Sequence, residues 1–448
     1  MSALHETANT VVVFGIDPLW YALSLFALTY FLIITEWLNR AIVALAVACL
    51  MILGGLITQQ AAFEGVDFNT LGLLTGMMLI VGIAKDSGMF QYVAIWGAKK
   101  VQARPWPLLV MLTLVTAVFS AFLDNVTTVL LIAPVTLLIT DELRLTPYPY
   151  LFAEIFASNI GGTATLIGDP PNIMIGSATG LTFNEFLLNL GPIVAIIFCL
   201  LLLPLYLIWG RKLHADEALR ARVMAYEERA SITDVRLLKQ SLFVLALVMT
   251  GFVFAHEIGL QPATIAVSGA ALLLVLDNLP RSAEHQSKAV ATAFNEVEWT
   301  TIFFFIGLFI VVHAVETTGA LERLAGGIVE LTAGNLTVTA LAIMWISAIA
   351  SSIIDNIPFV ATMIPMIHDM AASFGGADQL RPLWWSLALG SCLGGNGSLV
   401  GASANLIVAG FADRAGQPIR FLPFMLMAFP LMLLSIVASS LYVWLRYL

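Results

Sequence analysis

The sequence has 448 residues, of which 11% are charged and 60% hydrophobic, with 20 Lys and Arg, 29 Asp and Glu, a formal net charge of −9 and a mean hydropathy of +0.93. A soluble globular domain carries about 25% charged residues and needs polar side chains to cover its surface, so this composition excludes a cytosolic enzyme, a nucleic-acid-binding protein and a disordered chain. A polytopic helical membrane protein remains. A transmembrane β-barrel would show segments of about ten residues in which apolar and polar residues alternate, whereas this chain has long continuous apolar runs.

Apolar segments long enough to cross a membrane recur along the chain, since a spanning helix needs about 20 mostly apolar residues. In chain order the uninterrupted segments are 18–35, 41–58, 69–85, 189–210, 239–256, 262–279, 299–316 and 421–445. Two further segments, 149–178 and 382–410, are interrupted by Gly, Asn, Asp or Pro, which predicts broken helices. The segments 107–140 and 337–370 are too long for one helix and have polar centres, which predicts re-entrant helical hairpins buried in protein.

The basic residues predict the orientation of these spans. The linker 211–238 is rich in Lys and Arg, and the positive-inside rule places it in the cytoplasm. With ten spans and two hairpins, all but three of the 20 basic residues then lie inside, the exceptions being Arg323, Arg381 and Arg446. We therefore expect a multi-pass protein of the plasma (inner) membrane with both termini outside.

The two halves of the chain resemble each other at a spacing of about 231 residues. Segment 124–134 aligns with 355–365 through shared Asp, Asn, Val and Pro, and 158–172 aligns with 391–405 through shared Ser, Gly, Leu and Asn. The halves 1–210 and 239–448 would each hold five spans, one of them broken, and one hairpin. An odd number of spans inverts the second copy, and inverted repeats with interrupted helices are typical of secondary transporters.

The hairpin tips and helix breaks predict one polar site in the membrane. A helix that stops inside the membrane leaves backbone N–H or C=O groups without partners, and its ends carry partial charges. Amide, hydroxyl and carboxylate side chains in these segments can line the same pocket. The candidate substrate- and ion-binding residues are Asp124, Asn125, Thr127, Ser158, Asn159, Gly161, Gly162, Thr163, Asp169, Asn172, Asp355, Asn356, Gly394, Gly395, Asn396, Ser398 and Asn405.

Five ionisable residues are candidates for proton coupling, because an ionisable group at membrane depth is costly and functional by default. They are Asp124, Asp169, Asp355, Glu154 and His313. Each also has a structural interpretation: a helix N-cap for the two hairpin-tip aspartates, an Asp-Pro turn for Asp169, and packing for the last two. Asp169 aligns with Ala402, so the repeat is asymmetric at this position.

Segment 158–173 and the two Asp-Asn hairpin tips resemble the ion-transporter superfamily, and within it the group of ArsB-type arsenite pumps, NhaD-type sodium/proton antiporters and the melanosomal P protein. The resemblance covers about 18–446. It implies a homodimer in which scaffold domains form the interface and mobile transport domains carry the substrate across, as in an elevator. Sodium-coupled dicarboxylate and citrate carriers resemble this pattern with Ser-Asn-Thr at the hairpin tips. The aspartates found here instead argue against a dicarboxylate site, because they add negative charge.

These observations favour a proton-coupled secondary transporter that exports arsenite, antimonite or a similar small inorganic solute. A Na⁺/H⁺ antiporter of the NhaD type is the alternative, and an anion channel or transporter like the P protein is the third hypothesis. We expect no enzymatic activity, no bound metal and no cofactor apart from the coupling ion, H⁺ or Na⁺. The expected partners are the solute, the lipid bilayer and a second copy of the chain, with no nucleic acid. An ATPase partner subunit would leave no trace in this sequence.

Overall fold

Helices form all the regular structure of the computed structural model, which describes residues 15–448 except 36 and 280. The first half contains α1 (Pro18–Thr35), α2 (Arg40–Leu53), α3 (Gln59–Glu64), α4 (Phe68–Lys85), α5 (Met89–Lys100), α6 (Pro105–Phe122), α7 (Asn125–Glu142), α8 (Tyr148–Gly162), α9 (Pro170–Thr179) and α10 (Phe183–Leu205), which continues as a π-helical turn, Tyr206–Gly210. The linker contains α11 (Glu217–Met224) and a 3₁₀ turn, Glu228–Ser231. The first 14 residues of the predicted first repeat lie outside the described residues.

The second half repeats this order of elements. It contains α12 (Val235–Val253), α13 (Ala255–Ile258), α14 (Pro262–Asn278), α15 (Ala283–Asn295), α16 (Trp299–Glu316), α17 (Ala320–Leu331), α18 (Leu336–Ile353), α19 (Asn356–Asp369), α20 (Arg381–Gly394), α21 (Ser403–Arg414) and α22 (Phe421–Tyr447), with 3₁₀ turns at Met370–Phe374, Ala377–Leu380 and Gly395–Gly397. The linker is slightly shorter than predicted, because Asp234 caps α12 by accepting from the backbone of Arg236 and Leu237.

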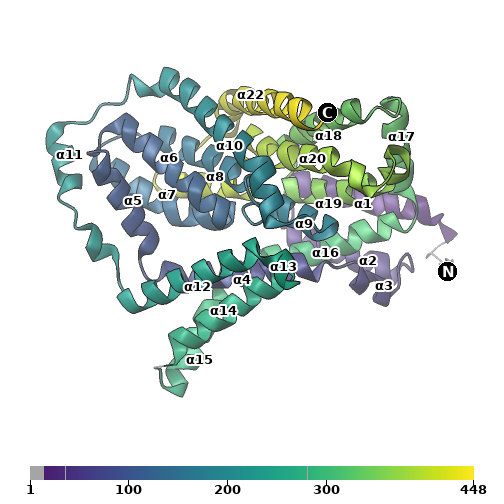
Figure 1. The fold of residues 1–448 in the computed structure, drawn as a ribbon, viewed down its shortest axis with the longest axis horizontal. Coiled ribbons are helices and arrows are strands. Elements are labelled where there is room, and N and C mark those ends of the chain that lie inside the picture. Colours follow the sequence, from purple (N-terminus) through teal and green to yellow (C-terminus); the bar gives the residue numbers. More distant parts are fainter. Residues whose placement is uncertain (1–14, 36, 280) are drawn as a thin grey trace.

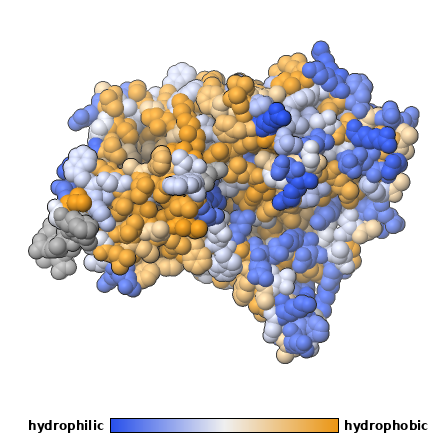
Figure 2. All heavy atoms as spheres, turned by 180° about the vertical axis from the view of Figure 1, so that it is seen from behind, coloured by the Kyte–Doolittle hydropathy of each residue, from blue (hydrophilic) through white to orange (hydrophobic). Residues whose placement is uncertain are grey.

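The chain is a multi-pass helical membrane protein. Ten described helices are long and apolar enough to cross a membrane: α1, α4, α6, α7, α10, α12, α16, α18, α19 and α22. Apolar residues cover most of the face in Figure 2, and hydrophilic residues gather along one edge and on the projecting lower part. The fold class predicted from the sequence is therefore confirmed.

The set of ten long helices differs from the ten predicted spans. Each arm of the two predicted hairpins reaches the length of a span, α19 only together with the 3₁₀ turn Met370–Phe374 that continues it, whereas α2 has 14 residues and α14 has 17. The predicted span 41–58 is shorter because Gly54 and Gly55 end α2, with Gly55 at a φ of +73° that favours glycine. Re-entry of the hairpins and the inverted orientation of the second half stay predictions.

Equivalent helices make equivalent contacts in the two halves. α4 packs along α14, and α16 packs along α2. A Cβ on Gly76 would lie 2.7 Å from the backbone of Ala266, and one on Gly307 would lie 2.6 Å from the backbone of Ala44. Glycine at these positions lets the helix backbones touch, as is common between membrane helices.

The hairpins and broken helices of the two halves pack against one another. α6 packs on α8 and α18 on α20, while α9 packs on α19 and α21 on α7, so each half contacts the hairpin of the other. In Figure 1 α6, α7 and α8 lie to the left, α18, α19 and α20 lie to the right with α9 next to them, and α4, α12, α14 and α16 lie below. The polar residues of the hairpin tips and helix breaks meet where these groups join.

The linker is bound to α5, the short helix between α4 and the first hairpin. Lys99 on α5 donates to the carbonyl of Tyr226 (2.9 Å) and pairs with Glu228 (2.5 Å). The backbone N–H of Thr233 donates to the carbonyl of Ser87 (3.1 Å) at the other end of α5. The linker therefore holds both ends of this helix.

Candidate transport site

The two helix breaks are closed by the same hydrogen bond in each half. α8 and α9 are separated by residues 163–169, and α20 and α21 by residues 395–402. The side-chain amide of Asn172 donates to the carbonyl of Thr165 (2.8 Å), and that of Asn405 donates to the carbonyl of Ser398 (2.9 Å). These amides satisfy carbonyl groups that an interrupted helix leaves unpaired.

Each hairpin is also attached to the broken helix of its own half. Ser120 donates to the carbonyl of Ser158 (2.5 Å), and Ser351 donates to the carbonyl of Ser391 (2.6 Å). A Cβ on Gly161 would lie 2.1 Å from a backbone oxygen of α6. Hairpin and break therefore form one closely packed unit in each half.

Asn159 connects the two halves at the centre of the site. Its carbonyl oxygen accepts from the side-chain amide of Asn125 (3.1 Å). Its own amide donates to the side-chain oxygens of Asn396 and Asn405, each at 3.0 Å. One side chain thus joins the first hairpin, the first broken helix and the second broken helix.

A thiol occupies the equivalent position in the second half. Cys392 aligns with Asn159 and donates to the side-chain oxygen of Asn172 (3.5 Å), just as Asn159 donates to Asn405. The residue is fully buried. Cys392 is not among the site residues predicted from the sequence, although its alignment with Asn159 was a usable signal.

Both hairpin-tip aspartates cap the returning helix. Asp124 accepts from the backbone N–H of Thr127 (2.7 Å) and from its hydroxyl, and Asp355 accepts from the backbone N–H of Ile357 (3.1 Å). Such caps satisfy backbone donors at the start of a helix. The capping interpretation is therefore correct for both residues. The Thr127 hydroxyl occupies the second carboxylate oxygen of Asp124, whereas the second oxygen of Asp355 makes other contacts.

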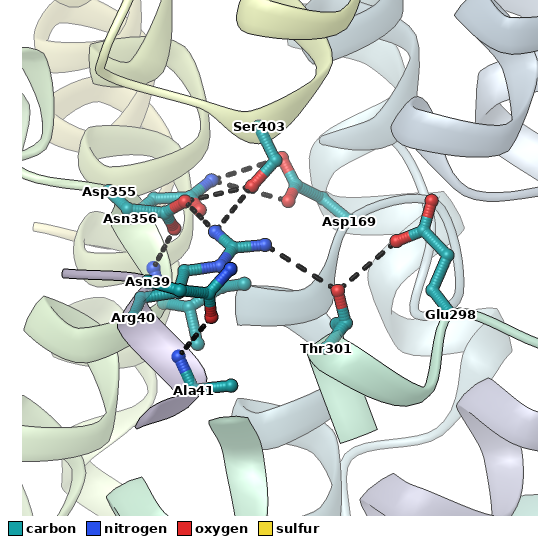
Figure 3. A network of polar contacts seen from close by, with 10 residues as sticks. Asn39, Arg40, Ala41, Asp169, Glu298, Thr301, Asp355, Asn356 and Ser403 are labelled. Carbon is teal, nitrogen blue, oxygen red and sulfur yellow. Dashed lines mark hydrogen bonds and ion pairs between the residues drawn. The ribbon is translucent and has the colours of Figure 1, made fainter. Parts of the chain in front are cut away.

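Asp355 is paired with an arginine that sequence reasoning did not place in the site. Nη1 of Arg40 lies 2.6 Å from Oδ2 of Asp355 and 2.6 Å from the hydroxyl of Ser403 (Figure 3). The guanidinium also reaches toward Thr301, whose hydroxyl donates to Glu298 (3.1 Å). From the sequence alone, Arg40 counts only among the cytoplasmic charges. In the structure it is the first residue of α2 and not part of a loop.

Asp169 is fully buried between the two halves. The side-chain amide of Asn356 points at its carboxylate and donates at 3.2 Å (Figure 3). Among the described residues, neither Asp169 nor Asp124 forms an ion pair with a basic side chain. Of the three aspartates in the site, only Asp355 has its charge compensated in this way.

The other two coupling candidates have other hydrogen-bond partners. Glu154 is buried on α8, one turn before Ser158, where it accepts from the hydroxyl of Thr136 and keeps its other oxygen without a partner. His313 contacts Glu316 (3.1 Å) and is half-buried at the end of α16 opposite to Glu298. The structure therefore does not bring His313 together with the aspartates.

The predicted binding residues otherwise lie together. All are buried except Thr127, which is half-buried: Asp124, Asn125, Ser158, Asn159, Gly161, Gly162, Thr163, Asp169, Asn172, Asp355, Asn356, Gly394, Gly395, Asn396, Ser398 and Asn405.

Two cavities lie at opposite ends of α16. One, of about 310 Å³, reaches Asp355 and is lined by Asn39, Arg40, Glu298 and Ser403 together with apolar side chains. The other, of about 300 Å³, is lined by His313, by further residues of α9, α16 and α19, and by the turn between α3 and α4. The first cavity gives the polar site its opening at the Arg40 end.

Comparisons with known proteins agree with this architecture. A sequence model described as "Citrate transporter" matches residues 30–390. An uncharacterized transporter of Mycobacterium tuberculosis is 44% identical over 431 residues, which cover 95% of this chain and 98% of that protein. The human P protein is 33% identical over 504 residues, which cover 94% of this chain and 59% of the P protein.

A solved structure has the same fold. The YdaH transporter of Alcanivorax borkumensis aligns with a TM-score of 0.58 at 15% identity, covering 95% of this chain and 97% of the YdaH chain. At this level of identity the likeness extends to the fold alone.

Proposed function

Since the chain belongs to the CitMHS family of secondary transporters, we propose that it couples the export of a small uncharged inorganic solute, of the arsenite or antimonite class, to the uptake of protons. The observation that carries the proposal is Asp169, a fully buried carboxylate that has no basic partner among the described residues and is held by Asn356 from the other half. A buried carboxylate of this kind is costly as an anion. Protonation of Asp169 removes this charge before the site crosses the membrane.

The polar groups of the site suit a neutral hydroxylated solute. Amide side chains of Asn125, Asn159 and Asn396 lie together and offer both donors and acceptors. Two of these amides keep one buried atom without a hydrogen-bond partner, namely Oδ1 of Asn125 and Nδ2 of Asn396. Such atoms are available to the hydroxyl groups of a trihydroxy metalloid.

The charge of the site argues against a di- or tricarboxylate cargo. Three aspartates line the site, and the guanidinium of Arg40 is already paired with Asp355. A citrate ion would add negative charge beside Asp124 and Asp169 without a free cation to receive it. The family name therefore states to which proteins this chain is related, and we assign the chain a cargo other than citrate.

Alternating access supplies the mechanism that we propose. The two hairpins and two broken helices interlock around the site, and this is the part that would move as a unit against α2, α4, α14 and α16. Protonation of Asp169 on one side and deprotonation on the other would couple this movement to the proton gradient. No ATP is needed for such a cycle.

Na⁺/H⁺ antiport is the second candidate, favoured by oxygen atoms near Asp124. Oδ1 of Asn125 and Oγ1 of Thr128 are buried without hydrogen-bond partners, directly after this carboxylate in the chain. Carboxylate, amide and hydroxyl oxygens are ligands suited to hard cations. In this version the aspartate would bind Na⁺ and H⁺ in turn.

Proteoliposomes with an imposed pH gradient test the proposal. We expect arsenite flux that dissipates the gradient in the wild type, and loss of this coupled flux in Asp169→Asn with the protein still folded. Sodium flux that dissipates the gradient without arsenite would replace the proposal with Na⁺/H⁺ antiport. Single-channel current steps would contradict both.

A further inference from the structure

Arg40 contacts the transport site from outside the group of hairpins and broken helices. It is the first residue of α2, which packs along α16, whereas its partners Asp355 and Ser403 lie at the tip of the second hairpin and the start of α21. We propose that Arg40 is a built-in counter-cation that occupies Asp355 in place of a coupling cation, and thereby drives release of that cation into the adjacent cavity. This inference rests on the proposed ion coupling and names a positioning residue for it.

The geometry of the pair puts Arg40 in the place where a cation would bind Asp355. Oδ2 receives Nη1 of Arg40 (2.6 Å) and the hydroxyl of Ser403 (2.9 Å), while Oδ1 accepts from the backbone of Ile357. The guanidinium lies 5.0 Å from the ring centroid of Phe304, a cation–π contact that holds it in place. Arg40 therefore neutralises the carboxylate as a bound ion would.

The surroundings of the pair allow exchange with solvent. The Asp355 side chain is 9% exposed and that of Arg40 is 25% exposed. Both line the cavity of about 310 Å³ at this end of the molecule. A cation that Arg40 displaces from Asp355 would leave through this cavity.

The pairing exists in one half only. Asp124 is equivalent to Asp355, and α14 packs on α4 as α2 packs on α16, but α14 begins with Pro262. Among the described residues Asp124 has no basic partner. The counter-cation is therefore a specific addition to the second hairpin and not a consequence of the repeat.

Movement of the second hairpin away from α2 would separate the pair. Asp355 would then be a buried carboxylate without its partner, and such a group takes up a proton or a metal cation. Return of the hairpin would bring Arg40 back and expel that cation. One arginine would thus link the position of the hairpin to the occupancy of its carboxylate.

Cation binding to purified protein tests this role without any transported solute. We would measure thermal stability while Na⁺ replaces choline at constant ionic strength, and separately while pH is lowered without Na⁺, so that the two arms distinguish Na⁺ from H⁺. In Arg40→Gln we expect half-maximal stabilisation at a Na⁺ or H⁺ concentration at least tenfold lower than in the wild type. Arg40→Lys should resemble the wild type, because it keeps the charge.

The double variant Arg40→Gln/Asp355→Asn should lose this gain, since its carboxylate is absent. Ser403→Ala, which removes one hydroxyl that holds the guanidinium, should shift the response in the same direction by a smaller factor and serves if Arg40→Gln does not fold. A wild-type response in both Arg40→Gln and Ser403→Ala, or an unchanged gain in the double variant, would overturn the inference. Absence of coupled flux in wild-type proteoliposomes would instead contradict the proposed function alone.

Discussion

Replacement of Asn159 by alanine removes the one side chain that joins three polar segments. Asn159 accepts one hydrogen bond from Asn125 and donates two, to Asn396 and Asn405. In Asn159→Ala the side chains of Asn125 and Asn396 lose their hydrogen-bond partners, because each already has one unpaired atom and no other bond among the described residues. Asn405 keeps its bonds to Gly395 and Ser398.

The loss follows from the number of bonds. Side-chain hydrogen bonds inside membrane proteins contribute about 0.6 kcal/mol on average, so three bonds correspond to about 2 kcal/mol. Burial of unsatisfied amides raises this figure toward about 3 kcal/mol. Cys392→Ala is the matched control, because it lies at the equivalent position and breaks one weak thiol bond to Asn172. Its loss should stay below about 1 kcal/mol.

Reversible unfolding in mixed micelles measures both variants under the same conditions. We expect Asn159→Ala to lose at least twice as much unfolding free energy as Cys392→Ala, and to transport poorly because the two halves are no longer joined at the site. Equal losses, or no loss in Asn159→Ala, would refute the view that this amide holds the halves together.

Two further predictions concern packing and the linker. Gly161→Ala should lower the unfolding free energy by about 1–3 kcal/mol, because its Cβ would meet a backbone oxygen of α6 at 2.1 Å. Gly410→Ala on α21 is the control, since its Cβ would enter open space, and it should be neutral. Melting curves in detergent that do not differ between the two variants would contradict this prediction. The hydrogen bond from Lys99 lowers the pKa of Glu228. At a pH above the ordinary glutamate pKa of about 4.3, the Glu228 carboxylate therefore stabilises the docked linker. This stabilisation is lost as the pH falls through the lowered pKa. Pepsin cleavage of the wild-type linker, divided by that of Glu228→Gln at the same pH to remove the pH dependence of pepsin itself, should therefore rise as pH falls from about 5 to about 3.

The positions of the hairpin tips and helix breaks could be predicted because they are encoded locally. Asp124 and Asp355 were expected at the start of returning helices, and α7 and α19 begin at the next residue. Gly, Pro and Asn interrupted the apolar segments near the ends of α8 and α20. Backbone preference and capping act over a few residues, so a single sequence carries them.

Contacts between distant segments could not be predicted in the same way. Arg40 and Asp355 are 315 residues apart, and the bond from Asn159 to Asn396 spans 237 residues. The repeat showed which segments are equivalent but not which side chains of the two halves meet. His313 illustrates the opposite error, since its place inside an apolar span suggested the site while the fold puts it in another cavity.

The buried thiol of Cys392 can report how often the centre of the protein opens. Cys49 and Cys199 are exposed, so Cys392 is the buried one of the chain's three cysteines, and it sits where the two broken helices meet. An alkylating reagent can reach it only when that junction opens. In a variant without Cys49 and Cys199, the alkylation rate of Cys392 would measure how often the junction opens. This measurement needs no attached probe and no transported solute.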